Sequence, residues 1–113
     1  MEVSELFSLE NLTKDTEVTI EGIFVMTLGV GYLVQSRDEV AIRHRAILVD
    51  FPDLEKHLRG FVPGYAGSKY AYCNEAVVSG VLKERNAFDF PYALQDIHNF
   101  TIYMYGESIR VDI

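Results

Sequence analysis

A short helix signal interrupts a chain that otherwise consists of β-forming segments. Leu54 and Leu58 fall one helical turn apart within Pro52–Arg59. Asp50 can cap this helix, and Gly60 can end it. Three β-forming segments precede the helix and the others follow it, and few β architectures place a helix there. We therefore predict a mainly β chain with this helix between its third and fourth strands.

The β-forming segments are rich in β-branched and aromatic residues. We expect strands at Glu17–Thr27, Tyr32–Ser36, His44–Phe51, Glu75–Glu84, Tyr92–Ile97 and Phe100–Tyr105, and a closing strand through Ile109, Val111 and Ile113. Gly22 and Gly80 interrupt two of these strands, which is typical of bulges and bends in a small barrel. We also expect a helix at Ser4–Leu12, a polar loop at residues 83–89, and a type II′ turn with Gly106 at its first central position.

Two stretches of the chain, LTKDTEVTIEGIF at Leu12–Phe24 and VVSGVL at Val77–Leu82, resemble the OB-fold family of nucleic-acid-binding domains. The segment Leu12–Phe24 resembles the family's opening, where a turn leads into the first strand. The segment Val77–Leu82 is similar to the family's fourth strand. The resemblance implies one OB-like domain over residues 1–113, a Greek-key barrel of five to six strands. Its core should hold Val18, Ile20, Phe24, Leu33, Ile47, Val49, Val78, Leu82 and Phe100.

The resemblance also implies a ligand face across the second and third strands, flanked by the loops at residues 28–31 and 83–89. Single-strand binders present exposed aromatic and basic side chains on this face. The side chains of this kind are Tyr32, Arg43, Arg45, Lys83, Arg85, Phe88 and Phe90, with Gln35 beside them. Alternation would place Arg43 and Arg45 on one face of a strand. A charged strand edge that discourages aggregation is the other interpretation of this pair.

The charge of the chain opposes the binding of single-stranded nucleic acid. The net charge is −7, and residues 1–21 hold six acids against one base, Lys14. Nucleic-acid binders are usually basic because neutralised phosphates dominate their affinity. We therefore expect a binding module with a protein partner, as a subunit, an adaptor or a small acidic inhibitor of a cationic toxin. The alternative is a single-stranded nucleic-acid-binding domain, and the closing strand leaves a sheet edge at which two copies could pair.

A tyrosine-bearing segment between the helix and the fourth strand offers contact area for a protein partner. It runs from Phe61 to Tyr72 and contains Tyr65, Lys69, Tyr70 and Tyr72. Tyrosine supplies large, rigid contact area at low entropic cost. Residues 64–69 are not a P-loop, because serine precedes lysine and a strand follows.

The sequence offers little for catalysis. His44, His57 and His98 lie far apart and have no metal-ligand spacing, so we predict no metal site and no cofactor. A pair of Cys73 with a histidine, brought together in space, is the enzymatic alternative. The N-terminus lacks the features of a signal peptide, and no apolar run is long enough for a membrane span. With a single cysteine, a cytoplasmic protein is expected.

Overall fold

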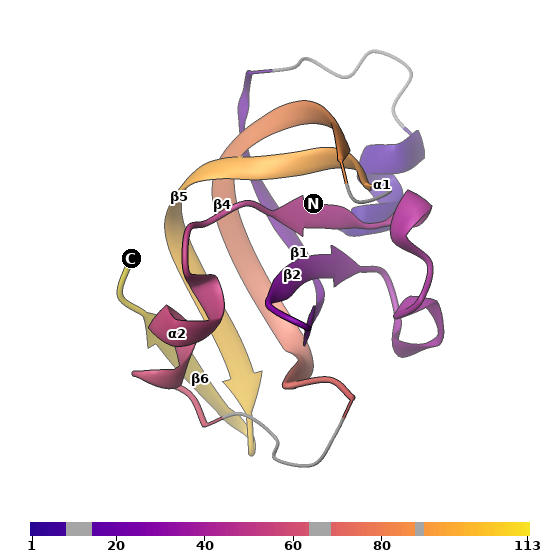
Figure 1. Cartoon of the computed structure of the whole chain (residues 1–113). Helices are drawn as coiled ribbons and strands as arrows, with labels where there is room; N and C mark the ends of the chain where they lie inside the picture. The colour runs from indigo at the N-terminus through magenta and orange to yellow at the C-terminus, as the bar shows by residue number, and fades with distance from the viewer. Residues whose placement is uncertain (9–14, 64–68, 88–89) are drawn as a thin grey trace.

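The structure is a computed structural model that describes the chain except for residues 9–14, 64–68 and 88–89 and the side chains of residues 85–87 (Figure 1). Its helices are α1 (Val3–Ser8) and α2 (Leu54–Arg59), with short 3₁₀ helices η1 (Arg37–Glu39) and η2 (Arg43–Arg45). Its strands are β1 (Glu17–Thr27), β2 (Val30–Val34), β3 (Ile47–Val49), β4 (Tyr72–Ala87), β5 (Phe90–Met104) and β6 (Glu107–Val111). No helix in this described part is long and apolar enough to cross a membrane.

Five of the strands close into a mixed barrel. β1 pairs antiparallel with β2 and β4, β2 pairs with β3, and β4 pairs with β5. A parallel pairing of β3 with β5, which includes Leu48 opposite Ala93, closes the barrel. β6 continues the sheet from β5 as an extra strand outside the closed barrel. The predicted fold class, a mainly β barrel with a short N-terminal helix and with α2 between the third and fourth strands, is confirmed, and the closed five-strand barrel is compatible with an OB-like one.

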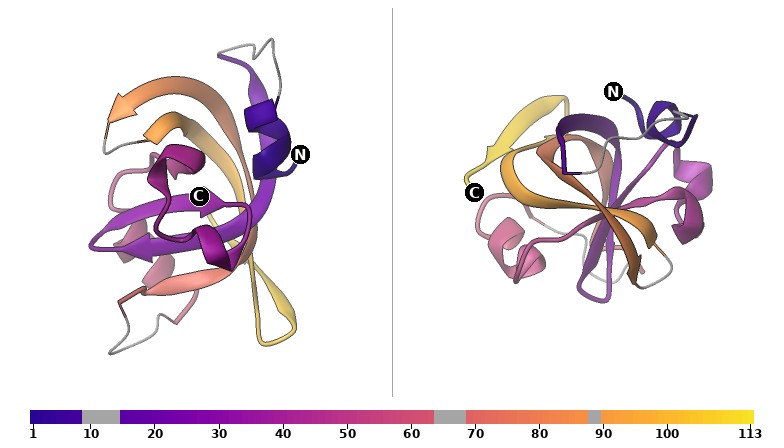
Figure 2. Two further views of the ribbon diagram at one scale, coloured as in Figure 1. Left: turned by 90° about the vertical axis from the view of Figure 1, so that its right-hand side faces the viewer. Right: turned by 90° about the horizontal axis from the view of Figure 1, so that it is seen from above.

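The barrel interior forms the main hydrophobic core. Phe24 lies at its centre, with its ring edge-on to Phe100 at a centroid distance of 5.0 Å. Of the predicted core residues, Ile20, Phe24, Leu33, Ile47, Val49, Val78, Leu82 and Phe100 are buried and Val18 is half-buried. α1 and α2 lie on opposite sides of the barrel (Figures 1 and 2), and Leu54 and Leu58 of α2 are buried in the core as predicted.

A close approach at Gly22 lets α1 pack against β1. A side-chain carbon on Gly22 would lie 2.7 Å from the carbonyl oxygen of Val34 and 2.9 Å from Cγ2 of Val3. The ladder between β1 and β4 runs through Gly22 without a register shift. The predicted bulge is therefore absent at Gly22, and the glycine instead makes room for the N-terminal segment. Val3 and Leu6 of this segment are buried in the core.

Several sequence-based boundaries are wrong. The third strand starts at Ile47 and not at His44, because Arg43–Arg45 form the 3₁₀ helix η2. Residues 83–87 belong to β4 and not to a polar loop, because they pair with residues at the start of β5. The two pieces predicted at Tyr92–Ile97 and Phe100–Tyr105 are one strand, which bends at Asp96 through a register irregularity opposite Gly80.

The β5–β6 hairpin has a different turn from the one predicted. Its two central residues are Tyr105 and Gly106, and both have positive φ, at 55° and 76°. Two successive positive φ angles define a type I′ turn, which matches the twist of the flanking strands. The predicted pairing of the last strand with the end of β5 is confirmed, with Ile102 opposite Ile109.

Candidate binding site

The aromatic side chains of the predicted ligand face are buried. Tyr32 is 1% exposed and Phe90 is fully buried, and their ring centroids are 5.1 Å apart. The guanidinium carbon of Arg43 lies 5.6 Å from the Tyr32 ring centroid and 5.3 Å from that of Phe90. The prediction that Tyr32 and Phe90 are exposed is therefore wrong. Phe88, predicted beside them, lies outside the described residues.

The hydroxyl group of Tyr32 is tied to the chain that covers it. It donates a hydrogen bond to the carbonyl oxygen of Val40 in the connection between β2 and β3. Burial raises the pKa of Tyr32 above its usual value, Tyr70 adds to the rise, and Arg43 opposes it. The phenol therefore stays neutral and remains a hydrogen-bond donor over the whole physiological pH range.

A second hydrophobic cluster explains why this face is closed. It lies on the outer side of the barrel and consists of Ile23, Val25, Tyr32, Val34, Ala46, Leu48, Phe90 and Ala93. Half-buried Val40, from the β2–β3 connection, packs against it, as do Tyr70 and Cys73. Cys73 thus takes the packing role that is ordinary for a partly buried cysteine. Among the described residues, the outer face of β2 and β3 offers no exposed aromatic ring for base stacking.

Tyr72 is also part of the structure and not of an exposed loop. It is fully buried at the start of β4, and its hydroxyl donates a hydrogen bond of 2.6 Å to the carbonyl oxygen of Val62. Burial raises the pKa of Tyr72, Arg59 opposes the rise, and Glu55 adds to it. The sequence-based prediction that Tyr72 lies in an irregular segment is wrong, because β4 begins three residues earlier than expected.

The other predicted site residues do not converge on one place. Arg45 forms an ion pair with Glu39 at 3.2 Å, and Lys83 forms one with Asp15. The ammonium group of Lys69 lies 5.6 Å from the ring centroid of Tyr70. Tyr65 and the side chain of Arg85 lie outside the described part of the structure.

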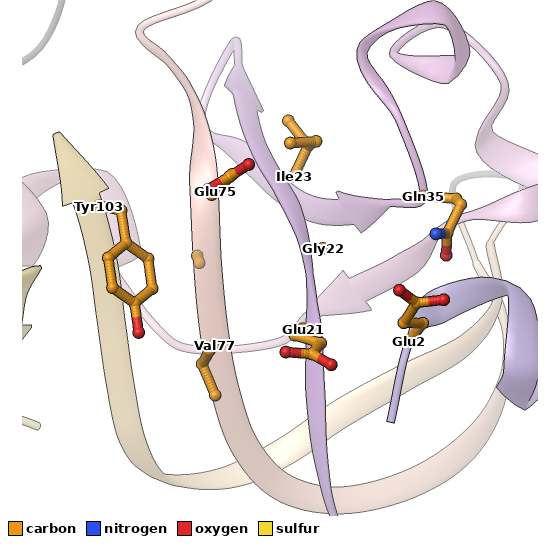
Figure 3. A pocket seen from close by; sticks show the side chains of 9 residues that line it. Glu2, Glu21, Gly22, Ile23, Gln35, Glu75, Val77 and Tyr103 are labelled. Carbon is orange, nitrogen blue, oxygen red and sulfur yellow. The ribbon is translucent and has the colours of Figure 1, made fainter. Parts of the chain in front are cut away.

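A hollow of about 380 Å³ lies elsewhere, on the outer face of β1, β4 and β5 (Figure 3). We call it the acidic groove. Its lining residues are Glu2, Glu21, Gly22, Ile23, Gln35, Glu75, Ala76, Val77 and Tyr103. Three carboxylates line one hollow, and the aromatic ring of Tyr103 stands beside them.

Strand register explains why these side chains meet. Glu75 lies opposite Ile23, and Val77 lies opposite Glu21, so both acids point to the outer face. Glu2 is joined to Glu21 by a parallel bridge, because the N-terminal residues line the edge of β1 that β2 leaves unpaired. Tyr103 extends the groove toward β6 and is 42% exposed.

The carboxylates of the groove are exposed and carry negative charge. Within the described residues, no basic side chain forms an ion pair with Glu2, Glu21 or Glu75. The amide oxygen of Gln35 accepts a hydrogen bond of 2.8 Å from the backbone N–H of Ser4, which leaves its NH₂ group as a donor. The groove therefore combines uncompensated negative charge, a partly apolar floor at Ile23 and Val77, and an aromatic wall.

Sequence reasoning did not find the groove. It counted Glu21 only among the six acids of residues 1–21, and it gave Glu75 and Tyr103 no role in a site. The available signal was the alternation in β1 and β4, which places Glu21 and Glu75 on outward-facing positions of strands that pair with each other. The strand register, which the sequence alone does not provide, brings them together.

The described residues hold no group of three or more histidine, cysteine, aspartate or glutamate side chains that could bind a metal ion. His98 pairs with Glu17, and the ring of His57 lies between Phe51 and Phe61, at centroid distances of 5.3 Å and 5.6 Å. In comparisons with known proteins, no family model, curated protein or solved structure matched the chain. The barrel and the acidic groove are therefore the features that indicate a function.

Proposed function

We propose that this chain is a non-enzymatic binding domain of the OB-fold type that recognises a basic segment of a protein partner through the acidic groove. The observation that carries the proposal is the grouping of Glu2, Glu21 and Glu75 around one hollow without a basic partner among the described residues. A lysine or arginine side chain of a partner would provide the missing positive charge.

The groove suits arginine particularly well. A guanidinium group can donate two parallel hydrogen bonds to a carboxylate such as Glu21 or Glu75. Its flat face can stack on the ring of Tyr103, where cation–π attraction adds to the contact. The net charge of −7 speeds the approach of a cationic protein at long range.

The same features disfavour the alternative of single-stranded nucleic acid. The negative charge of the groove repels phosphate groups, and the rings of Tyr32 and Phe90 are buried where a base would have to stack. A nucleic-acid ligand would have to displace residues of the β2–β3 connection before it reached either ring. Protein binding requires no such rearrangement.

The proposal can be tested with a short arginine-rich peptide as the probe. Isothermal titration at low salt should show binding that becomes at least tenfold weaker in a Glu21→Gln/Glu75→Gln double variant. The reason is that two contacts to exposed carboxylates are lost, and each is worth about 1 kcal/mol, the upper end for exposed ion pairs.

A matched control removes two charges elsewhere. Asp38 and Glu107 are exposed and do not line the groove, so an Asp38→Asn/Glu107→Gln variant has the same net charge as the test variant. Its affinity for the peptide should stay within about threefold of the original. An equal loss in both double variants would mean that the peptide senses only the total charge, and it would refute binding at the groove.

A further inference from the structure

One edge of the sheet is unpaired in the described part of the structure. β6 pairs only with β5, through a hairpin whose turn is Tyr105-Gly106. This hairpin projects beyond the barrel (Figure 2, left). In a two-residue hairpin the residues that flank the turn, here Met104 and Glu107, exchange backbone hydrogen bonds. Alternation then directs the backbone N–H and C=O groups of Ser108 and Arg110 to the outer edge.

The sequence along this edge is complementary to itself when it is reversed. Residues 109–113 read Ile-Arg-Val-Asp-Ile, so the apolar positions are symmetric about Val111 and the two positions beside it, Arg110 and Asp112, carry opposite charges. If two copies pair antiparallel about a two-fold axis at Val111, Arg110 of each copy lies opposite Asp112 of the other. Ile109 then lies opposite Ile113, and Val111 lies opposite itself. Opposite charges and paired apolar side chains directly across a ladder both stabilise it.

We propose that two copies of this chain associate through β6, with the two-fold axis at Val111 and reciprocal Arg110–Asp112 ion pairs. A two-fold interface requires a surface that complements itself, and residues 109–113 meet that requirement. The pairing also provides partners for two side chains that form no hydrogen bond or ion pair within the described residues, Arg110 and Asp112. It covers Ile113, which is 38% exposed.

Helix α2 contacts this edge of the sheet at Asp112. Nε2 of His57 in α2 forms a hydrogen bond with the carbonyl oxygen of Asp112. A carbonyl oxygen has two lone pairs, so it can accept a second hydrogen bond from Arg110 of the other copy. The hydrogen bond between His57 and Asp112 holds Asp112 beside α2 in the single copy. It therefore reduces the loss of conformational freedom when two copies pair.

The interface would be small. Stable protein interfaces bury at least about 1,200 Å² in total, and one pair of five-residue strands buries less than that. We therefore expect weak, reversible association that is visible at submillimolar to millimolar protein concentration. The acidic groove does not include β6, so this association is independent of the function proposed above.

Sedimentation velocity over a concentration series tests the proposal by exchanging the charges. Arg110→Glu places two acids opposite each other in a homodimer, and Asp112→Arg places two bases opposite each other. Each variant alone should self-associate at least tenfold more weakly than the original chain. An equimolar mixture should associate again, because every Arg or Glu at position 110 then faces its opposite charge at position 112.

Both positions are exposed, so the variants should keep the original far-ultraviolet circular dichroism spectrum and melting temperature. A variant that loses its fold is replaced by Arg110→Gln or Asp112→Asn, for which the loss of association should be smaller but in the same direction. A monomeric original chain at the highest concentration would refute the proposal. Single variants that associate like the original, or a mixture that stays monomeric, would refute it as well.

Discussion

Replacing Leu58 with alanine should lower the free energy of unfolding by about 2–5 kcal/mol, which is the range for a fully buried leucine. Leu58 is fully buried, and it lies in the same core cluster as Phe24 and Tyr72. α2 has only six residues, which is too short for a helix to be stable by itself. The packing of Leu54 and Leu58 is therefore the main interaction that holds α2 against the barrel. Urea unfolding followed by circular dichroism measures the change.

The chain offers a matched control for this substitution. Leu28 is 96% exposed in the turn between β1 and β2, so a Leu28→Ala variant should change the free energy of unfolding by less than about 0.5 kcal/mol. If Leu58→Ala had no larger effect than Leu28→Ala, the packing of α2 in the core through Leu58 would be contradicted.

A Gly80→Ala variant should be destabilised by about 3 kcal/mol, the upper end of the usual cost of overpacking. A side-chain carbon there would lie 2.6 Å from the carbonyl oxygen of Gln95 and 2.9 Å from Cδ1 of Ile97. The first contact is with backbone in the strand that bends at Asp96, so relief requires β5 to move away from β4. Differential scanning calorimetry should show a melting temperature lower by more than about 10 °C.

Gly60 provides the comparison. Gly60 has a φ of −74° at the end of α2. A side-chain carbon added there would lie 3.3 Å from its nearest neighbour, the carbonyl oxygen of His57. Gly60→Ala should therefore shift the melting temperature by only a few degrees. Equal shifts at positions 60 and 80 would contradict the close approach of β4 and β5 at Gly80.

The sequence predicted the barrel well where local patterns and tertiary structure agree. β1 was predicted with its observed bounds, Glu17–Thr27, because a polar turn precedes it and a glycine turn follows it. α2 was predicted to within two residues of its observed start. Leu54 and Leu58 are spaced by one helical turn, and both side chains are buried in the core. In α2 the burial pattern follows the helical spacing, whereas in β1 residues 23–27 are all buried and the flanking turns set the bounds.

The prediction failed where contacts distant in sequence decide the structure. Arg43 and Arg45 look like alternating strand residues, but they lie in a 3₁₀ helix, and Arg43 lies over the rings of Tyr32 and Phe90. Tyr32 was expected to be exposed because the OB-fold resemblance places it on the ligand face. The second hydrophobic cluster buries it, and the residues of that cluster come from several strands and a connection, so no local pattern signals the burial.

The acidic groove could not be predicted for a similar reason. Its acids come from the N-terminal segment, β1 and β4, and no pattern within one segment signals that they share a hollow. The fold class followed from the order of local elements, whereas the groove depends on the register between strands.

The most direct test of protein recognition through the acidic groove is a pair of nuclear magnetic resonance titrations on ¹⁵N-labelled protein at low salt. The arginine-rich peptide should shift the amide signals around Glu21, Glu75 and Tyr103, and single-stranded DNA or RNA should shift none of the amide signals. The account would be contradicted if the oligonucleotide bound at micromolar affinity, with shifts around Arg43 and Arg45 that weaken steeply with salt and vanish in an Arg43→Ala/Arg45→Ala variant.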